Sequence, residues 1–280
     1  MKGMNKRMIA NIPSSEQSPL EYVIANQSQS TMEMVQEAIT HNQTLLAFQP
    51  VMHGINRTTP AFYEGLIRVL DATGRVIPAG EFMGRIEDTE IGRQVDVLAL
   101  RHGLTTLRNN PGVRLSINMS ARSIGYRPWM NCLNRFLNEV PHIGERLILE
   151  ISEASTMTVP ELVIDFMNRL QPKGICFALD NFGSGNLAIR YFKDFDFDIL
   201  KISGQFIRGI AQNPDNQAVV RALHSIAEQF DMFTVAESVE TAADAALIME
   251  IGINCLQGYY FSAPTTMPDW LQNTAPAQSA

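Results

Sequence analysis

The sequence predicts a single α/β domain folded as a (β/α)8, or TIM-like, barrel, on three observations. Eight short apolar runs have the length and composition of strands, and most are followed by a segment with helical periodicity. The chain has 280 residues, within the usual range for such a barrel, and no linker-like stretch interrupts the alternation. An open doubly wound sheet is the alternative. No G-x-G-x-x-G motif that follows a strand and opens a helix supports it.

The eight predicted strands are rich in aliphatic and aromatic residues and are bounded by turn-forming or polar residues. In chain order they cover residues 45–51, 61–69, 114–118, 147–151, 175–179, 197–202, 232–236 and 253–259. The predicted helices have apolar residues three to four positions apart. One helix is predicted to begin near Thr31 and another after Thr158. The others are predicted to cover residues 81–107, 127–139, 215–230 and 241–251. Pro128 in a first turn, Thr158 as an N-cap with Glu161 three residues on, and Gly252 as a stop support these helix ends.

The barrel domain is predicted to cover residues 31–268. Residues 1–30 are rich in Ser, Gln and Asn and are expected to form a flexible leader. The chain becomes polar and small again from about Thr265, so residues 269–280 are expected to form a disordered tail. The basic residues near the start are not followed by an apolar core of signal-peptide length. No apolar run approaches a membrane span, so no membrane is expected among the partners.

The net charge and the cysteines indicate which partners and which cellular location to expect. The net charge is −7, which argues against a nucleic-acid polymer as the partner because no basic surplus exists to neutralise a phosphate backbone. A small phosphate ligand held through metal ions is still compatible with that charge. Cys132, Cys176 and Cys255 are widely spaced and form neither a disulfide framework nor a zinc motif. A reducing, cytoplasmic location is therefore expected.

The stretch from Leu179 to Gly185 has the composition of a site at the end of a parallel strand. An apolar run ends abruptly at Asp180 and Asn181, and a turn with two glycines follows. Loops at the carboxyl ends of parallel strands commonly carry function. The alternative is that Asp180 and Asn181 only form a turn and cap the next helix.

Polar residues also lie on, or just after, six more of the predicted strands. The whole set is Glu64, Asn118, Glu150, Asp180, Asn181, Lys201, Glu237 and Gln257. The ends of parallel barrel strands converge on one face, so these side chains are expected to share a pocket. Four carboxylates and two asparagines without histidine form an oxygen-donor set that suits Mg²⁺ or Mn²⁺. Two such ions can activate a water for attack on a phosphodiester, and a nearby lysine can neutralise developing charge.

With these residues in view, the sequence resembles the EAL domain family of bacterial cyclic di-GMP phosphodiesterases, from about Leu45 to Pro264. The segments that carry the resemblance are Phe48-Gln49-Pro50, Glu64-Gly65-Leu66-Ile67-Arg68, Asn118-Met119-Ser120, Leu149-Glu150-Ile151-Ser152-Glu153, Asp180-Asn181-Phe182-Gly183-Ser184-Gly185, Leu200-Lys201-Ile202, Ala236-Glu237-Ser238-Val239-Glu240-Thr241 and Gln257 through Pro264. The resemblance implies a modified (β/α)8 barrel whose first strand runs antiparallel. It also implies hydrolysis of one phosphodiester bond of cyclic di-GMP, which gives linear pGpG.

The resemblance also implies a role for each site residue. The ligands of a first metal ion would be Glu64, Asn118, Glu150 and Asp180, and those of a second would be Asp180, Asn181 and Glu237. Catalysis would involve Lys201, beside the attacking water, and Glu237. Nucleotide contacts would come from Gln49, Leu66, Arg68 and Pro264. Glu153 would brace the loop after Asp180, and Gln257 would lie at the floor of the site. Tyr259, Tyr260 and Phe261 are expected to pack in the barrel.

Three positions depart from the family pattern. Glu64-Gly65-Leu66 replaces Glu-Ala-Leu, which removes no ligand and is expected to be tolerated. Asn181 replaces an aspartate of the second metal site, and an amide brings no negative charge to an ion that relies on carboxylates. One bound Mg²⁺ or Mn²⁺ is therefore expected, with the second weakened. Ser203 stands where the family usually has aspartate, which is expected to loosen packing around Lys201.

Three functions follow as hypotheses. The first is a cyclic di-GMP-binding protein with weak or no phosphodiesterase activity, because of Asn181. The second is a working metal-dependent phosphodiesterase, favoured by the presence of Lys201, Glu237 and Gln257. The third is a protein-interaction module that no longer uses the nucleotide. The resemblance also allows a homodimer and a protein partner.

Overall fold

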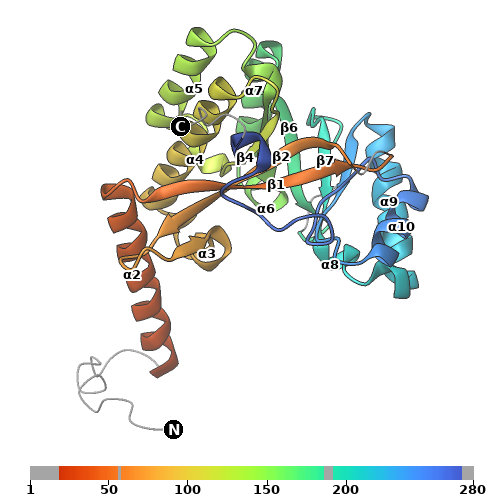
Figure 1. The fold of residues 1–280 in the computed structure, drawn as a ribbon, viewed down its shortest axis with the longest axis horizontal. Helices are drawn as coiled ribbons and strands as arrows, with labels where there is room; N and C mark the ends of the chain where they lie inside the picture. The colour runs from red at the N-terminus through yellow and green to blue at the C-terminus, as the bar shows by residue number, and fades with distance from the viewer. Residues whose placement is uncertain (1–18, 56–57, 186–191, 273–280) are drawn as a thin grey trace, which may run out of the picture.

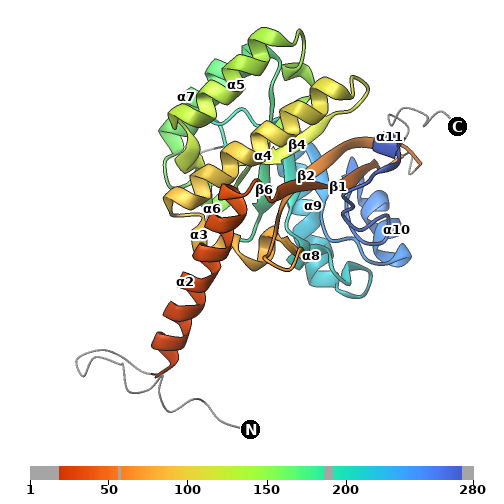
Figure 2. The ribbon, with the colours of Figure 1, turned by 60° about the vertical axis from the view of Figure 1, so that its left-hand side comes forward.

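The computed structural model describes residues 19–55, 58–185 and 192–272. Eight strands form a closed ring in the order β1-β9-β8-β7-β6-β5-β4-β2, and β1 pairs with β2 to complete it. Strand β1 (Thr44–His53) is antiparallel to both neighbours, β2 (Pro60–Leu70) and β9 (Cys255–Leu256). The other ring pairs, from β2 through β9, are parallel. The predicted modified barrel with an antiparallel first strand is confirmed, and helices cover its outside (Figures 1 and 2).

The remaining ring strands are short and almost fully buried, as expected for parallel strands covered by helices. They are β4 (Leu115–Asn118), β5 (Leu147–Ser152), β6 (Cys176–Phe182), β7 (Ile199–Ile202) and β8 (Phe233–Ala236). A ninth strand, β3 (Val76–Pro78), extends the sheet beside β2 and was not predicted. The last predicted strand, 253–259, shrinks to the two residues of β9.

The long helices of the outer layer alternate with the strands. They are α4 (Glu90–Asn109), α5 (Arg127–Glu139), α7 (Pro160–Leu170), α9 (Pro214–Gln229) and α10 (Ala242–Ile251). Single-turn helices α3 (Met83–Ile86), α6 (Glu153–Thr156) and α8 (Gly204–Ile207) lie in the connections, with short 3-10 turns such as Ala121–Ser123. The predicted helix 81–107 is therefore split into a 3-10 turn, α3 and α4. No described helix is long and apolar enough to cross a membrane.

The observed helix ends match the end signals predicted from the sequence, except at the start of α7. Pro128 lies in the first turn of α5, and Gly252 ends α10 in the left-handed region at φ 103°, both as predicted. Helix α7, however, starts at Pro160, and its N-cap is Val159 rather than Thr158. The Thr158 hydroxyl instead donates to the carbonyl of Ser155, at 2.7 Å.

Regular secondary structure extends beyond both limits expected from the sequence, while the domain bounds 31–268 stay a prediction. Helix α2 (Pro19–Thr40) starts at Pro19 rather than near Thr31, and it extends away from the barrel (Figure 2). Residues 1–18 and 273–280 lie outside the described residues. After Pro264, Thr265 pairs with Phe48 of β1, and α11 (Asp269–Gln272) lies at the start of the segment that was expected to be disordered. Trp270 packs edge-on against Phe48 and Tyr63, with ring centroids 5.0 and 5.4 Å away.

The barrel interior is built in layers that determine where polar residues lie. A small apolar cluster has one residue from each of seven strands: Val51, Phe62, Ile148, Ala178, Ile199, Val235 and Cys255. Side chains alternate between the two faces of a strand, so residues two positions away point to the same side. The next inward positions towards the carboxyl ends of the parallel strands are therefore polar: Gln49 of the antiparallel β1, with Glu64, Glu150, Asp180, Lys201, Glu237 and Gln257. The apolar layer thus lies beneath a polar layer.

Candidate active site

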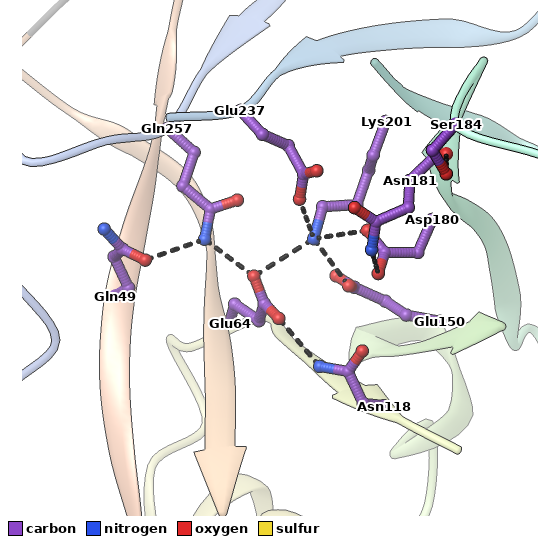
Figure 3. A network of polar contacts seen from close by, with 10 residues as sticks. All are labelled: Gln49, Glu64, Asn118, Glu150, Asp180, Asn181, Ser184, Lys201, Glu237 and Gln257. Carbon is purple, nitrogen blue, oxygen red and sulfur yellow. Dashed lines mark hydrogen bonds and ion pairs between the residues drawn. The ribbon is translucent and has the colours of Figure 1, made fainter. Parts of the chain in front are cut away.

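The polar layer gathers around Lys201 of β7 (Figure 3). The Lys201 side chain is 1% exposed, and its ammonium Nζ forms ion pairs with four carboxylates. The distances from Nζ are 3.0 Å to Glu64 Oε2, 2.6 Å to Glu150 Oε2, 3.3 Å to Asp180 Oδ1 and 3.0 Å to Glu237 Oε1. The four predicted carboxylates and the predicted lysine thus lie together, as the convergence of strand ends requires.

Amide side chains hold Glu64 from the other side. Gln257 Nε2 donates to Glu64 Oε2 at 2.6 Å, and Asn118 Nδ2 donates to Glu64 Oε1 at 2.7 Å. The same Gln257 nitrogen lies 3.1 Å from Gln49 Oε1, and Gln49 in turn donates to the carbonyl of Ser262 at 3.1 Å. Both oxygens of Glu64 are therefore fixed by donors on three other strand ends.

The buried charges shift one another's pKa values. Burial and the charge of Glu64 raise the pKa of Glu150 to about 8. Burial and the charge of Asp180 raise the pKa of Glu237 well above its usual range. Burial also opposes ionisation of Glu64, but Lys201 and the amide donors outweigh it and lower its pKa. The four carboxylates raise the pKa of Lys201 well above its usual value despite its burial. The site therefore holds more carboxylates than its single lysine can neutralise.

Several buried oxygens at this site have no hydrogen-bond donor. They are Glu150 Oε1, Asp180 Oδ1 and Gln257 Oε1. Asp180 Oδ1 lies near the Lys201 ammonium without forming a hydrogen bond to it. Among the residues that the structure describes, no group of three or more His, Cys, Asp or Glu is arranged so that it could hold a metal ion. The four carboxylates of the site converge on Lys201 instead. The donor set and the spare oxygens nevertheless suit a hard cation, which would share these carboxylates with Lys201.

The loop after Asp180 departs from regular strand geometry. The pairing of β6 with β7 shifts register between Leu179 and Phe182, and Asn181 lies in the left-handed region at φ 56°. Asparagine is among the non-glycine residues that tolerate this conformation best. Asn181 Nδ2 donates to Asp180 Oδ2 at 2.8 Å. In this arrangement the amide therefore presents its donor, and not its oxygen, to the Asp180 carboxylate.

Glu153, at the start of α6, is hydrogen-bonded to the backbone of that loop. Its Oε2 accepts hydrogen bonds from the backbone N–H of Gly183 at 2.9 Å and of Gly185 at 3.1 Å. A Cβ at Gly185 would lie 3.1 Å from the Glu153 carboxyl group, so the glycine permits this close approach. The contact is what the predicted bracing role of Glu153 needs.

A cavity of about 880 Å³ opens above this layer. Its lining contains ten of the thirteen site residues predicted from the sequence: Gln49, Glu64, Leu66, Arg68, Asn118, Asp180, Asn181, Glu237, Gln257 and Pro264. Glu150, Lys201 and Glu153 do not line it. Arg68 is half-buried, and its guanidinium donates to the carbonyl of Ile67 at 3.0 Å.

Sequence reasoning missed other residues of the cavity. Tyr259 was expected to pack in the barrel but is 71% exposed and lines the cavity, and Tyr260 is exposed as well, whereas Phe261 packs against the core. Asp96 and Arg208 also line it. Asp96 had a usable signal, since it is a carboxylate flanked by Val95 and Val97 in an apolar helical pattern. Arg208, which donates to Ser238 Oγ at 3.0 Å, had none.

Comparison with known proteins defines the class. Residues 32–264 match the EAL domain, so the chain belongs to the EAL domain family. The signaling protein YkoW of Bacillus subtilis (strain 168) is 30% identical over 237 residues, which are 83% of this chain and 30% of that protein. The cyclic di-GMP phosphodiesterase PdeF of Escherichia coli (strain K12) is 27% identical over 262 residues, 89% of this chain and 34% of that protein. The chain thus spans about a third of the length of these curated relatives.

Solved structures agree with this assignment. The PaMucR phosphodiesterase in complex with c-di-GMP superposes with a TM-score of 0.73 at 25% identity, over 84% of this chain and 97% of that one. The FimX EAL domain from Pseudomonas aeruginosa bound to c-di-GMP has a TM-score of 0.75 at 23% identity, over 84% and 96% of the two chains. The second likeness supports the barrel fold alone.

Proposed function

We propose that this barrel binds cyclic di-GMP in its cavity together with one divalent ion, and hydrolyses it slowly or not at all. The observation that carries the proposal is the polar layer itself, where four carboxylates meet a single lysine at the floor of the cavity. Membership of the EAL domain family and the ligand named for the PaMucR structure support the choice of nucleotide. The described cysteines are free, which fits the expected cytoplasmic location.

The residues that would hold a first Mg²⁺ or Mn²⁺ are Glu64, Asn118, Glu150 and Asp180. When bound, the ion would neutralise charge and lower the pKa of a coordinated water. The spare oxygens of Glu150 and Asp180 are available to it, and Gln257 keeps Glu64 oriented from below. Glu237 and Asn181 would complete a second site.

The remaining cavity residues would bind the nucleotide itself. Arg68 places a half-buried guanidinium beside the acidic floor, where a phosphate would pair with it. Gln49, Leu66 and Pro264 line the same cavity and would contact the rest of the ligand. Lys201 lies within ion-pair distance of Asp180 and Glu237, which would keep its ammonium next to an attacking water.

Asn181 supports slow hydrolysis. Its side chain supplies no charge to the second site, and its Nδ2 occupies Asp180 Oδ2. A second Mg²⁺ would therefore bind with one carboxylate fewer and in competition with an amide donor. A loss of a few kcal/mol of transition-state stabilisation lowers the rate by tenfold for each 1.36 kcal/mol.

An active phosphodiesterase is the second candidate function. The contacts of Lys201 with Asp180 and Glu237 favour it, because the lysine and both carboxylates predicted to act on the water are together. This candidate predicts turnover in Mn²⁺ or Mg²⁺ that Glu64→Ala abolishes and that Asn181→Asp barely changes.

Equilibrium binding of cyclic di-GMP in Ca²⁺ buffer tests the first proposal. The parent chain is expected to bind with micromolar affinity or better, and Arg68→Ala to weaken binding by at least about tenfold, since a charged hydrogen bond is lost. Arg169→Ala removes an exposed arginine of α7 and is the matched control. Absence of binding, or equal binding by Arg68→Ala, would contradict the proposal.

A further inference from the structure

Asp96 is a buried carboxylate that the proposed chemistry does not use. It lies in the second turn of α4 between Val95 and Val97, and the residue is 4% exposed. Placing a carboxylate in such surroundings is costly unless hydrogen bonds compensate. Asp96 also lines the cavity. Its position therefore needs an explanation other than helix packing.

The hydrogen bonds of Asp96 go to the connection that follows β4. Asp96 Oδ2 accepts from the backbone N–H of Ser120 at 3.0 Å and from the hydroxyl of Ser123 at 2.6 Å. Two residues before Ser120 lies Asn118, which holds Glu64. The carboxylate thus fixes the segment 118–123 to the outer helix layer.

The same segment is held on its other side by Ser155 of α6. The backbone N–H of Ala121 donates to Ser155 Oγ at 2.8 Å. Two residues before Ser155 lies Glu153, which accepts hydrogen bonds from the backbone N–H groups of Gly183 and Gly185. A contiguous set of contacts therefore runs from α4, through the segment 118–123 and α6, to the loop that carries Asp180 and Asn181.

We infer that Asp96 is a positioning residue that sets the segment 118–123 against α6 and thereby holds Asn118 and the Asp180 loop in place for the ligand. It does so as a hydrogen-bond acceptor for two donors, and not through its charge. Burial raises the pKa of Asp96 to about 7, so an uncharged side chain is compatible with this place. An asparagine, whose Oδ1 can accept from both donors, should therefore replace it.

Two variants distinguish the role of Asp96 as a hydrogen-bond acceptor from any role of its charge. Asp96→Asn keeps an acceptor oxygen, and Asp96→Ala removes it. Where cyclic di-GMP affinity is the measurement, the inference rests on the proposed function. We expect Asp96→Asn to bind within about threefold of the parent and Asp96→Ala to bind at least about tenfold more weakly, at a temperature where circular dichroism shows all chains folded.

Hydrogen–deuterium exchange gives a measurement that needs no nucleotide. Asp96→Ala is expected to accelerate exchange both in residues 118–123 and in residues 181–185, while Asp96→Asn leaves both protected. The matched control is Asp198→Ala. Asp198 accepts from the backbone N–H of Phe177 at 2.7 Å, but at the opposite end of the barrel. This control is expected to lower the melting temperature without changing exchange in the two segments.

The outcomes are decisive in each case. Unchanged exchange at 181–185 in Asp96→Ala, or equal losses in the Ala and Asn variants, would overturn the inference. If Asp96→Ala does not fold, Ser123→Ala removes only the 2.6 Å hydrogen bond and is expected to show the same pattern more weakly. A parent chain that binds no cyclic di-GMP would refute the proposed function, while the exchange comparison would still decide the role of Asp96.

Discussion

Lys201 carries one positive charge among four carboxylates, and this imbalance dominates the chemistry of the site. The pKa values of Glu150 and Glu237 are raised, chiefly by burial and by neighbouring carboxylates, whereas that of Glu64 is lowered. A divalent ion at this site would add positive charge and so lower the cost of keeping the carboxylates ionised.

Lys201→Met removes the internal cation and tests this view. Breaking a buried ion pair by removing one partner costs about 3–5 kcal/mol, so in EDTA the melting temperature is expected to fall on the order of 10 °C. Mn²⁺ should then raise the melting temperature of the variant more than that of the parent, since the ion becomes the replacement cation. Lys193→Met, at an exposed lysine, is the control. Equal rises for parent and variant would show that Lys201 and the ion do not share the carboxylates.

Asp96 gives a prediction about pH. Burial, with a smaller contribution from the charge of Glu87, raises its pKa from 3.8 to about 7. The folded state therefore holds the Asp96 proton more tightly than the unfolded state does. The resulting stability is fully present below the unfolded-state pKa of 3.8 and is lost as the pH rises through the folded-state pKa of about 7. Between pH 5 and pH 8 the parent should lose about 2–3 kcal/mol of unfolding free energy relative to Asp96→Asn. Urea denaturation at both pH values measures the difference, and parallel changes in the two chains would refute the shifted pKa.

The residues of the site could be predicted from the sequence because strand ends converge and side chains alternate. Glu64, Glu150, Asp180, Lys201 and Glu237 are found together for that reason. Their mutual contacts could not be predicted, because they depend on barrel stagger and on the bulge after Leu179. The role of each residue towards metal and nucleotide stays a prediction.

Among the elements, the long periodic segments were predictable, and the short or irregular ones were not. Helix α5 and strand β5 lie where their patterns put them. Helix α7 starts later because Pro160 fits the first turn, while Thr158 is used by the preceding turn. Strand β9 is short because the chain bends at Gly258, whose Cβ position is blocked by the backbone of Val239.

Residues 265–272 contain regular structure that the sequence did not predict. Small polar residues suggested fraying, but Thr265 exchanges two backbone hydrogen bonds with Phe48, at 2.7 and 3.0 Å. Composition cannot reveal such a long-range pairing. Helix α11 then places Trp270 against two aromatic rings of the β1–β2 hairpin.

Trp270→Ala is therefore expected to destabilise the barrel by about 1–3 kcal/mol, because a partly buried aromatic contact is lost. The melting temperature should fall by several degrees, and Trp270→Phe should recover part of the loss. Differential scanning calorimetry of the three chains provides the measurement. An unchanged melting temperature in Trp270→Ala would mean that α11 does not contribute to the fold.

For the whole molecule, closure of the barrel is what turns separate strand motifs into one site. Eight strand candidates and their alternation with helices predicted the ring, and the EAL resemblance predicted the antiparallel β1. The closed ring places an apolar layer beneath a charged one, so the carboxylates of distant segments lie together, and Glu64, Asp180 and Glu237 line one cavity. Under the proposed function, the activity of the whole molecule depends on whether the cavity only binds cyclic di-GMP or also positions it for hydrolysis.

The most direct test is hydrolysis of cyclic di-GMP by the purified chain in Mg²⁺ and in Mn²⁺, with Asn181→Asp measured beside it and Glu64→Ala in both backgrounds as the control. We expect little or no pGpG from the parent and a rate at least about tenfold higher from Asn181→Asp, since the second metal site regains a carboxylate. Comparable rates from the two chains, both abolished by Glu64→Ala, would refute this expectation and show that Asn181 does not limit catalysis.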